Sequence, residues 1–312
     1  ETARLLKGME ISREETNRWC SPDQKAFAVT VMNLGITLLH TVFGFYYVKV
    51  FLQNYQIEDS WFQLSQGLFV VWTGLNAPVM GILMDTGDSW LRQRKRVIAY
   101  CALPTAIAFM VPWLPWTTTG SPPWLVGLHL ILSLFLNDAV ISVTWLAYSA
   151  LFTESAETET DRTRFWAYQE AFALLAMPSV FLVDKLSSSL TNFFMFQIAC
   201  GFLAVIAYIS VQYTGSRAPQ NESTLRGSQQ QPSLNWAEIW IVAKQILSNT
   251  NFRYIVGAHF FLVCRMVAHE NFTAIVTEAV LGDLLPRGST LISLFYGLNT
   301  VLPQVIKTDI TM

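Results

Sequence analysis

Residues 67–96 read GLFVVWTGLNAPVMGILMDTGDSWLRQRKR. This stretch completes an apolar run that begins at Ser60 and contains no Asp, Glu, Lys or Arg before Asp85. The run is long enough to cross the hydrocarbon core of a bilayer, about 30 Å thick, as a single helix. Clustered Lys and Arg residues keep a loop on the cytoplasmic side of a membrane, and four of them follow the run: Arg92, Arg94, Lys95 and Arg96. The stretch therefore predicts a spanning helix that ends in a charged cytoplasmic hinge.

The whole chain has the composition of an integral membrane protein. Hydrophobic residues make up 52% of the 312 residues and charged residues 13%, whereas soluble domains carry about 25% charged residues. The mean hydropathy is +0.36. The cysteines show neither pairing nor metal-ligand spacing, so we interpret them as packing residues: Cys20, Cys101, Cys200 and Cys264. Because the chain begins at Glu1 rather than Met, we expect it to be a fragment of a longer protein.

Apolar runs of spanning length predict eight helices. They cover residues 26–48, 60–84, two spans within 97–152 separated by a proline-rich turn, 165–183, 190–213, 254–280 and 289–306. This order predicts four regions: a cytoplasmic tail (1–25), a six-helix bundle (26–213), a cytoplasmic linker with a short amphipathic helix on the membrane surface (214–250), and the first two spans of a second, truncated bundle (251–312).

The distribution of positive charge predicts the orientation of these spans. If the N-terminus lies in the cytoplasm, all but four of the 20 Lys and Arg residues fall in cytoplasmic segments. The exceptions are Lys185 and Arg287 outside and Lys49 and Arg265 in the membrane. Lys49 ends the first span, so we expect its side chain to snorkel to the interface. The asymmetry predicts a multi-pass protein with a cytoplasmic N-terminus.

The segment 76–85 (NAPVMGILMD) and its basic loop resemble the hinge between the second and third helices of the major facilitator superfamily. The similarity is greatest to the sugar–cation symporter branch that includes the melibiose carrier. Gly81 and Asp85 match the Gly-x-x-x-Asp core of that hinge. Within the branch, the chain is similar to the orphan transmembrane protein 180-like members in the following short motifs: Leu39–His40 to Tyr46–Tyr47, Leu75–Asn76, Asp161–Arg162–Thr163, Asn251–Phe252 and Asn271–Phe272.

The resemblance implies an all-α, facilitator-type helix bundle with six N-terminal spans and an incomplete C-terminal half. It also implies carboxylates in the second and fourth helices that bind the coupling cation, but the positions that align here hold Thr73, Ala77 and Trp145. Asn33 replaces a substrate-facing acid of the first helix, and Gln169 replaces an arginine of the fifth. Hard cations need several oxygen ligands, preferably charged ones. Cation-coupled sugar symport of the melibiose type is therefore not expected, even if the fold is kept.

Two charged loops are candidates for an inner gate. The basic loop is expected to face the acidic segment 154–161 across the cytoplasmic side, and a network of such pairs would bias a two-state equilibrium where one exposed pair would not. The alternative is that the basic loop only anchors the topology. The predicted gating residues are Gly81, Asp85, Arg92, Arg94, Lys95, Arg96, Glu154, Asp161 and Arg162.

Asp138 lies in the middle of the fourth span, where a charged group is costly and usually faces a cavity or a partner. Its expected partners are Arg265 and, less well, His40; the alternative is a protonated acid hydrogen-bonded to a neighbouring helix. Arg265 and Glu270 are five residues apart and do not share a helix face closely, so at least one should face a cavity. Aromatic side chains nearby either stack on a solute or simply pack. The predicted pathway residues are Asn33, His40, Trp72, Thr73, Asn76, Asp138, Trp145, Tyr148, Gln169, Arg265 and Glu270.

The sequence shows no phosphate loop, nucleophile motif, metal-ligand spacing or basic–aromatic surface for nucleic acid, so neither an enzyme nor a cofactor is predicted. The expected function is the movement of a small organic solute, sugar-like by resemblance, through alternating access. The bilayer and an unknown solute are the expected partners, and H⁺ or another cation is a candidate driving ion. The alternative is a facilitator-fold membrane protein that does not transport and acts as a scaffold.

Overall fold

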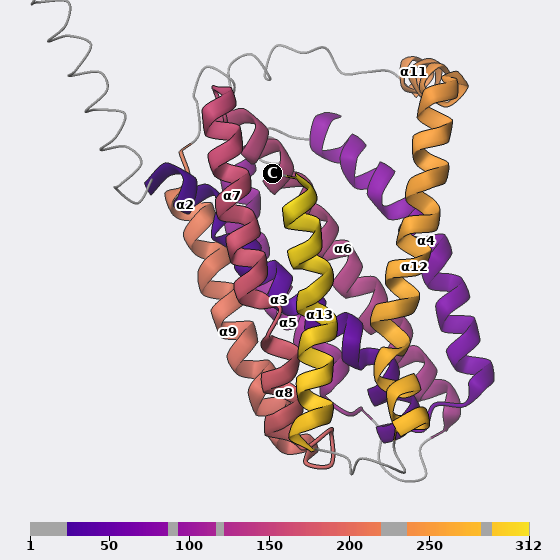
Figure 1. Cartoon of the computed structure of the whole chain (residues 1–312). Helices are drawn as coiled ribbons and strands as arrows, with labels where there is room; N and C mark the ends of the chain where they lie inside the picture. Colours follow the sequence, from indigo (N-terminus) through magenta and orange to yellow (C-terminus); the bar gives the residue numbers. More distant parts are fainter. Residues whose placement is uncertain (1–23, 87–92, 117–121, 220–235, 282–288, 312) are drawn as a thin grey trace, which may run out of the picture.

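The described part of the chain is a bundle of helices and contains no strand (Figure 1). The computed structural model describes residues 24–86, 93–116, 122–219, 236–281 and 289–311. Among these residues, six helical segments are long and apolar enough to cross a membrane. The all-α prediction is confirmed. Residues 1–23 of the predicted cytoplasmic tail, residues 220–235 of the linker and residues 87–92 of the basic hinge lie outside the described residues.

The predicted spans fall on the following helices. The first is built from α2 (Gln24–Thr30), α3 (Met32–Lys49) and a π-helical turn (Val50–Asn54). The others are α4 (Asp59–Thr86), α5 (Arg94–Met110) with a 3₁₀ turn (Val111–Trp113), α6 (Pro123–Ser155), α7 (Glu159–Ala176) with α8 (Ser179–Ser187), and α9 (Phe193–Arg217). The C-terminal part contains α11 (Trp236–Ser248), α12 (Thr250–Leu281) and α13 (Thr290–Thr311).

Two elements differ from the prediction. The fifth span was predicted as one helix over 165–183, but it begins earlier, where the Thr158 side chain accepts a hydrogen bond from the Asp161 N–H at 3.1 Å. It is also divided before Pro178, whose ring nitrogen has no hydrogen to donate. Helices α12 and α13 lie where the seventh and eighth spans were predicted. Within the described residues, however, α12 is not among the six apolar spans, and α13 contributes the shorter apolar segment Thr290–Leu302. Charged residues within α12, such as Arg265 and Glu278, lower its hydropathy.

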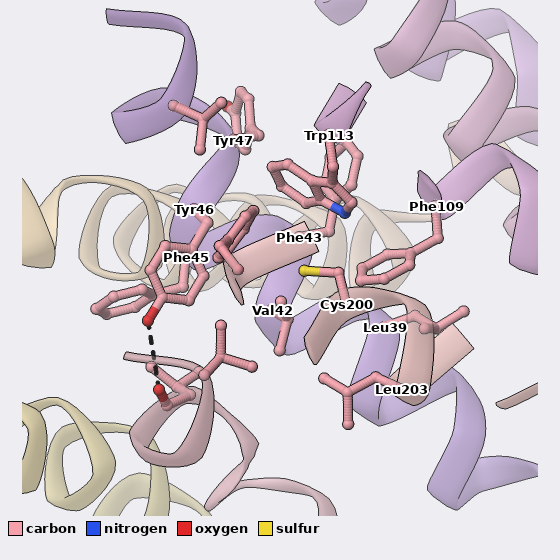
Figure 2. Close-up of a cluster of buried hydrophobic side chains, with 14 of the residues drawn as sticks. Leu39, Val42, Phe43, Phe45, Tyr46, Tyr47, Phe109, Trp113, Cys200 and Leu203 are labelled. Carbon is pink, nitrogen blue, oxygen red and sulfur yellow. Dashed lines mark hydrogen bonds between the residues drawn. The ribbon is translucent and has the colours of Figure 1, made fainter. Parts of the chain in front are cut away.

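Helix α3 forms the centre of the main core (Figure 2). Tyr46 and Trp113 are fully buried there, and both rings lie 5.1 Å from the Phe196 ring. Cys200 is buried in the same cluster and acts as a small apolar residue. This packing explains why α3 is so apolar on all sides: it is enclosed by other helices, whereas α4 keeps most of its surface exposed.

The two C-terminal helices pack onto the N-terminal bundle through different neighbours. Helix α12 contacts α3, and α13 contacts α8 and α7 (Figure 1). The α8–α13 contact is close because Gly297 has no side chain: a Cβ there would lie 2.9 Å from the Phe181 Cβ. Small residues allow membrane helices to approach in this way. The first and last thirds of the chain are therefore joined directly.

Candidate functional site

A polar cluster lies between α4 and α6, around Asp138. Asn76 Nδ2 donates to Asp138 Oδ2 at 2.8 Å and to Ser142 Oγ at 3.1 Å. Asn76 is 4% exposed, and the Asp138 side chain is half-buried. Pro78, two residues after Asn76, has no N–H, so the Gly74 carbonyl one turn earlier loses its usual helical donor. The sequence thus places an amide, a carboxyl group and a hydroxyl group in one short stretch of two helices.

One polar atom of this seam is buried without a hydrogen-bond partner in the described structure: Asn76 Oδ1. The Trp72 indole stacks on Phe135 with ring centroids 4.8 Å apart and interacts with the Asp138 carboxyl group. Buried polar groups are nearly always satisfied. The unpaired Asn76 oxygen beside an intramembrane carboxyl group is therefore suited to hold water or a polar solute.

Two further atoms of α6, Ser133 Oγ and Asn137 Oδ1, are also buried without a hydrogen-bond partner. They lie on the helix face of Thr144, whose hydroxyl group is 3.4 Å from that of Thr105 on α5.

A second cluster joins three predicted pathway residues from three helices. Asn33 Nδ2 on α3 donates to the Gln169 carbonyl on α7 at 2.9 Å, and the Tyr148 hydroxyl on α6 donates to Gln169 Oε1 at 2.8 Å. The Trp145 ring lies 5.4 Å from the Tyr148 ring and is 41% exposed. The polar groups of Asn33, Tyr148 and Gln169 are thus hydrogen-bonded within the cluster, which joins α3, α6 and α7.

Three other predicted pathway residues, His40, Thr73 and Arg265, make no described contact with either cluster. The expected pairing of Asp138 with Arg265 or His40 is wrong: its described partner is Asn76, while Arg265 and His40 have exposed side chains. The reason is that α6 packs against α4, which offers an amide at the depth of Asp138. Thr73 donates to its own helix, to the Val70 carbonyl at 3.1 Å. The Glu270 side chain lies outside the described residues.

On the cytoplasmic side of the predicted topology, Arg94 and Glu154 join α5 to α6. Arg94 Nε lies 3.7 Å from Glu154 Oε1, and the two side chains are 12% and 26% exposed. An Arg94 amino group also donates to the Met84 carbonyl at 3.5 Å, which brings in the end of α4. The predicted hinge and acidic loop thus meet at this pair.

The remaining predicted gating residues contribute less to such a latch in the described part of the chain. Arg162 pairs with Glu159 of its own helix at 3.1 Å, and Glu157 lies 3.6 Å from Lys25 rather than facing the basic loop. At Gly81 nothing lies within 4 Å of the position that a Cβ would take, Lys95 is half-buried and Arg96 is exposed. The Asp161 N–H donates to the Thr158 hydroxyl group that caps α7. Arg92 and the side chain of Asp85 lie outside the described residues.

Sequence reasoning missed a buried ion pair between α3 and α12. Lys49 does not snorkel: its side chain is fully buried and pairs with Glu278, whose side chain is 6% exposed. Gln53 Nε2 donates to the other Glu278 oxygen at 3.3 Å. A signal was present, because the predicted topology places Lys49 and Glu278 at the same outer end of two spans with the same direction.

It also missed Asp184, a fully buried carboxyl group at the end of α8. Hydroxyl groups from three segments donate to it: Ser189 at 3.0 Å, Ser293 of α13 at 2.7 Å, and Tyr46 of α3 at 3.4 Å. Nothing in the spacing of these residues indicates that they meet.

Comparisons with known proteins identify a family and relatives of this chain. Residues 26–301 match the family model described as MFS/sugar transport protein. Transmembrane protein 180 of Gallus gallus is 24% identical over 298 residues, which cover 85% of this chain and 56% of that protein. Transmembrane protein 180 of Mus musculus is 24% identical over 297 residues, with 84% and 56% covered. The chain thus spans about half the length of these relatives, and no solved structure matches it.

The match covers most of the chain and coincides with its helical bundle, so the predicted superfamily is confirmed. With six apolar spans, the chain is an integral, multi-pass membrane protein. The family points to transport rather than to catalysis. The chain belongs to the MFS/sugar transport protein family.

Proposed function

We propose that the protein moves a small organic solute across a membrane by alternating access, with its N-terminus on the cytoplasmic side. The observation that carries this proposal is the α4–α6 seam, where the Asp138 carboxyl group accepts a hydrogen bond from Asn76 and interacts with Trp72, beside the unpaired oxygen of the Asn76 amide. Polar and ionisable groups inside a membrane are costly and commonly mark a transport pathway. The family description makes a sugar-like solute the first class to test.

The proposal also includes an ion that drives transport, with Asp138 as its binding group. Thr73, Ala77 and Trp145 offer no carboxylate for a hard cation, so Asp138 is the carboxyl group in this seam that a proton or another cation would use. If H⁺ drives transport, uptake requires an inward proton gradient and is lost when Asp138 is replaced by Asn.

A scaffold that does not transport is the second candidate, and one observation favours it. The predicted pathway was expected to place Asn33, Tyr148 and Gln169 toward a solute. Instead, Asn33 and Tyr148 both donate hydrogen bonds to Gln169, and these contacts hold their three helices together. In this alternative the seam at Asp138 is a structural polar contact.

The two candidates are separated by uptake into proteoliposomes that contain the complete protein. We expect one or more radiolabelled mono- or disaccharides to enter in a saturable way, and Asp138→Asn to lower the rate at least about tenfold, as is common for an intramembrane pathway residue. Asp59→Asn, an exposed acid in the first turn of α4, serves as the matched control and should leave the rate unchanged. If no sugar enters, or if Asp138→Asn transports like the parent, the scaffold is favoured.

A further inference from the structure

The polar contacts between the N-terminal bundle and the two C-terminal helices gather at one end of the molecule. Lys49 and Gln53 lie where the first span ends, and Glu278 lies near the end of α12. Asp184 lies near the end of α8, and Ser293 in the first turn of α13. Figure 1 shows the ends of α12 and α8 and the start of α13 together at the lower end of the bundle. In the predicted topology this is the outer side.

Helix α12 is more deeply buried near the end that carries these polar contacts than in its first half. Near the outer end, Asn271 and Ala274 are 9% and 0% exposed. In its first half, Tyr254 and Phe261 are both 74% exposed. Within the described part of the chain, α12 is therefore fastened to the N-terminal bundle at its outer end.

The Lys49–Glu278 pair is the strongest of these fastenings. Two charges removed from water are tolerable only when they meet each other and find further hydrogen bonds, and removal of one partner leaves a costly lone charge. Here the ammonium group meets the carboxylate, and Gln53 adds a hydrogen bond to Glu278. Helix α12 cannot leave α3 without exposing both charges. The ion pair is therefore either closed and shielded from water or separated with both charges hydrated. A state in which the charges are apart but not hydrated would have a high free energy.

A second, weaker fastening joins α8 to α13. Ser293 Oγ donates to Asp184 at 2.7 Å, while Ser189 and Tyr46 supply further hydroxyl groups. Water can replace a serine hydroxyl group as a donor far more easily than it can replace a buried counter-charge. The turn after α8 adds strain: Ser188, Ser189 and Leu190 all have positive φ, of 50°, 55° and 67°. Such backbone persists only where its surroundings hold it.

We propose that the Lys49–Glu278 ion pair and the Asp184–Ser293 hydrogen bond form an outer lock, which holds the extracellular side of the protein closed and must open in each cycle. This inference deepens the alternating-access function proposed above and rests on it. The ion pair is the main determinant of the closed state, and the serine contact is the subsidiary one.

The lock is tested by the accessibility of a cysteine placed behind it. Ala274 is fully buried on α12, one helical turn inward from Glu278 on the same face. The complete protein with Ala274→Cys is treated from outside with a membrane-impermeant maleimide, and labelling of the protein without this substitution is subtracted. We expect Lys49→Gln and Glu278→Gln each to raise the labelling rate at least about tenfold, because each leaves one buried charge unpaired. Ser293→Ala should raise it by a smaller factor.

Two rescue variants and one control make the test specific. Charge reversal, Lys49→Glu with Glu278→Lys, should return labelling close to the parent rate. If that variant is not monodisperse, the neutral pair Lys49→Met with Glu278→Gln takes its place and should label more slowly than either single variant, since no lone charge remains. Lys185→Gln is the matched control: Lys185 Nζ donates to Thr290 across the same α8–α13 contact at 2.8 Å but is exposed, so its loss should leave labelling unchanged.

The outcomes separate the lock from the transport proposal, because labelling needs no solute. If both single variants label as slowly as the parent, or if both rescue variants label as fast as the single ones, the lock is wrong even where a solute is transported. If labelling behaves as expected but no solute moves, the lock holds and the transport proposal fails.

Discussion

Asn76 donates its side-chain amide group to two residues of the neighbouring helix, Asp138 and Ser142, and its own side-chain oxygen is buried without a partner. Asp138 depends on this amide in a place where a lone carboxyl group is costly. The Asn76–Asp138 contact should therefore contribute to the stability of the folded protein whether or not a solute is transported.

We predict that Asn76→Leu destabilises the protein, because Leu has a similar size but leaves the Asp138 carboxyl group without its 2.8 Å donor. The expected loss is about 1–3 kcal/mol, the usual cost of an unsatisfied buried polar group. Thermal unfolding in detergent measures it. Thr73→Val on the same helix is the control and should cost less than about 0.5 kcal/mol, since Thr73 donates only to its own helix. Equal unfolding temperatures for the two variants would show that the Asn76–Asp138 contact contributes nothing.

At the scale of elements, α3 and α9 approach closely because Gly35 has no side chain. A Cβ at Gly35 would lie 2.1 Å from Ser210 Oγ and 2.8 Å from the Ala207 Cα. The hydroxyl group can rotate away, but the backbone of α9 cannot. The helix pair at the centre of the bundle therefore tolerates no added atom at this position.

We predict that Gly35→Ala lowers stability by about 1–3 kcal/mol, the range typical of overpacking. Gly201→Ala on α9 is the matched control, because nothing lies within 4 Å of its added Cβ. That substitution should be neutral or stabilise by up to about 1 kcal/mol, since alanine loses less backbone entropy than glycine in a helix. The measurement is the thermal unfolding temperature of both variants in the same detergent and buffer. A Gly35→Ala protein as stable as the Gly201→Ala protein would mean that α3 and α9 are not in close contact.

At the scale of the whole molecule, the sequence predicts helices well and their contacts poorly. The span predicted over 190–213 appears as α9 (Phe193–Arg217), because an apolar run of that length has few other solutions in a membrane. The division of the fifth span before Pro178 was not predicted, since a proline inside an apolar run is compatible with a continuous helix as well as with a break.

The partners of polar residues were the part that the sequence could not supply. Lys49 and Glu278 are 229 positions apart, and only the packing of α12 on α3 makes Lys49 a buried residue rather than an interfacial one. Asp138 was recognised as an intramembrane acid, yet its partner depends on which helix faces α6. Asn33, Tyr148 and Gln169 were expected near one pathway, and the structure joins them directly. Depth in the membrane is readable from a sequence, whereas the facing helix is not.

Alternating access requires the outer ends of α3 and α12 to separate and close again as a solute is carried. Spin labels at Asn54→Cys and Val280→Cys, both exposed positions at these ends, report their distance by pulsed electron paramagnetic resonance. Alternating access predicts two distance populations, the shorter one dominant without solute and their ratio changed by a transported sugar. A single, unchanging distance, with and without every sugar tested and in the Glu278→Gln variant, would contradict transport and leave a rigid membrane scaffold.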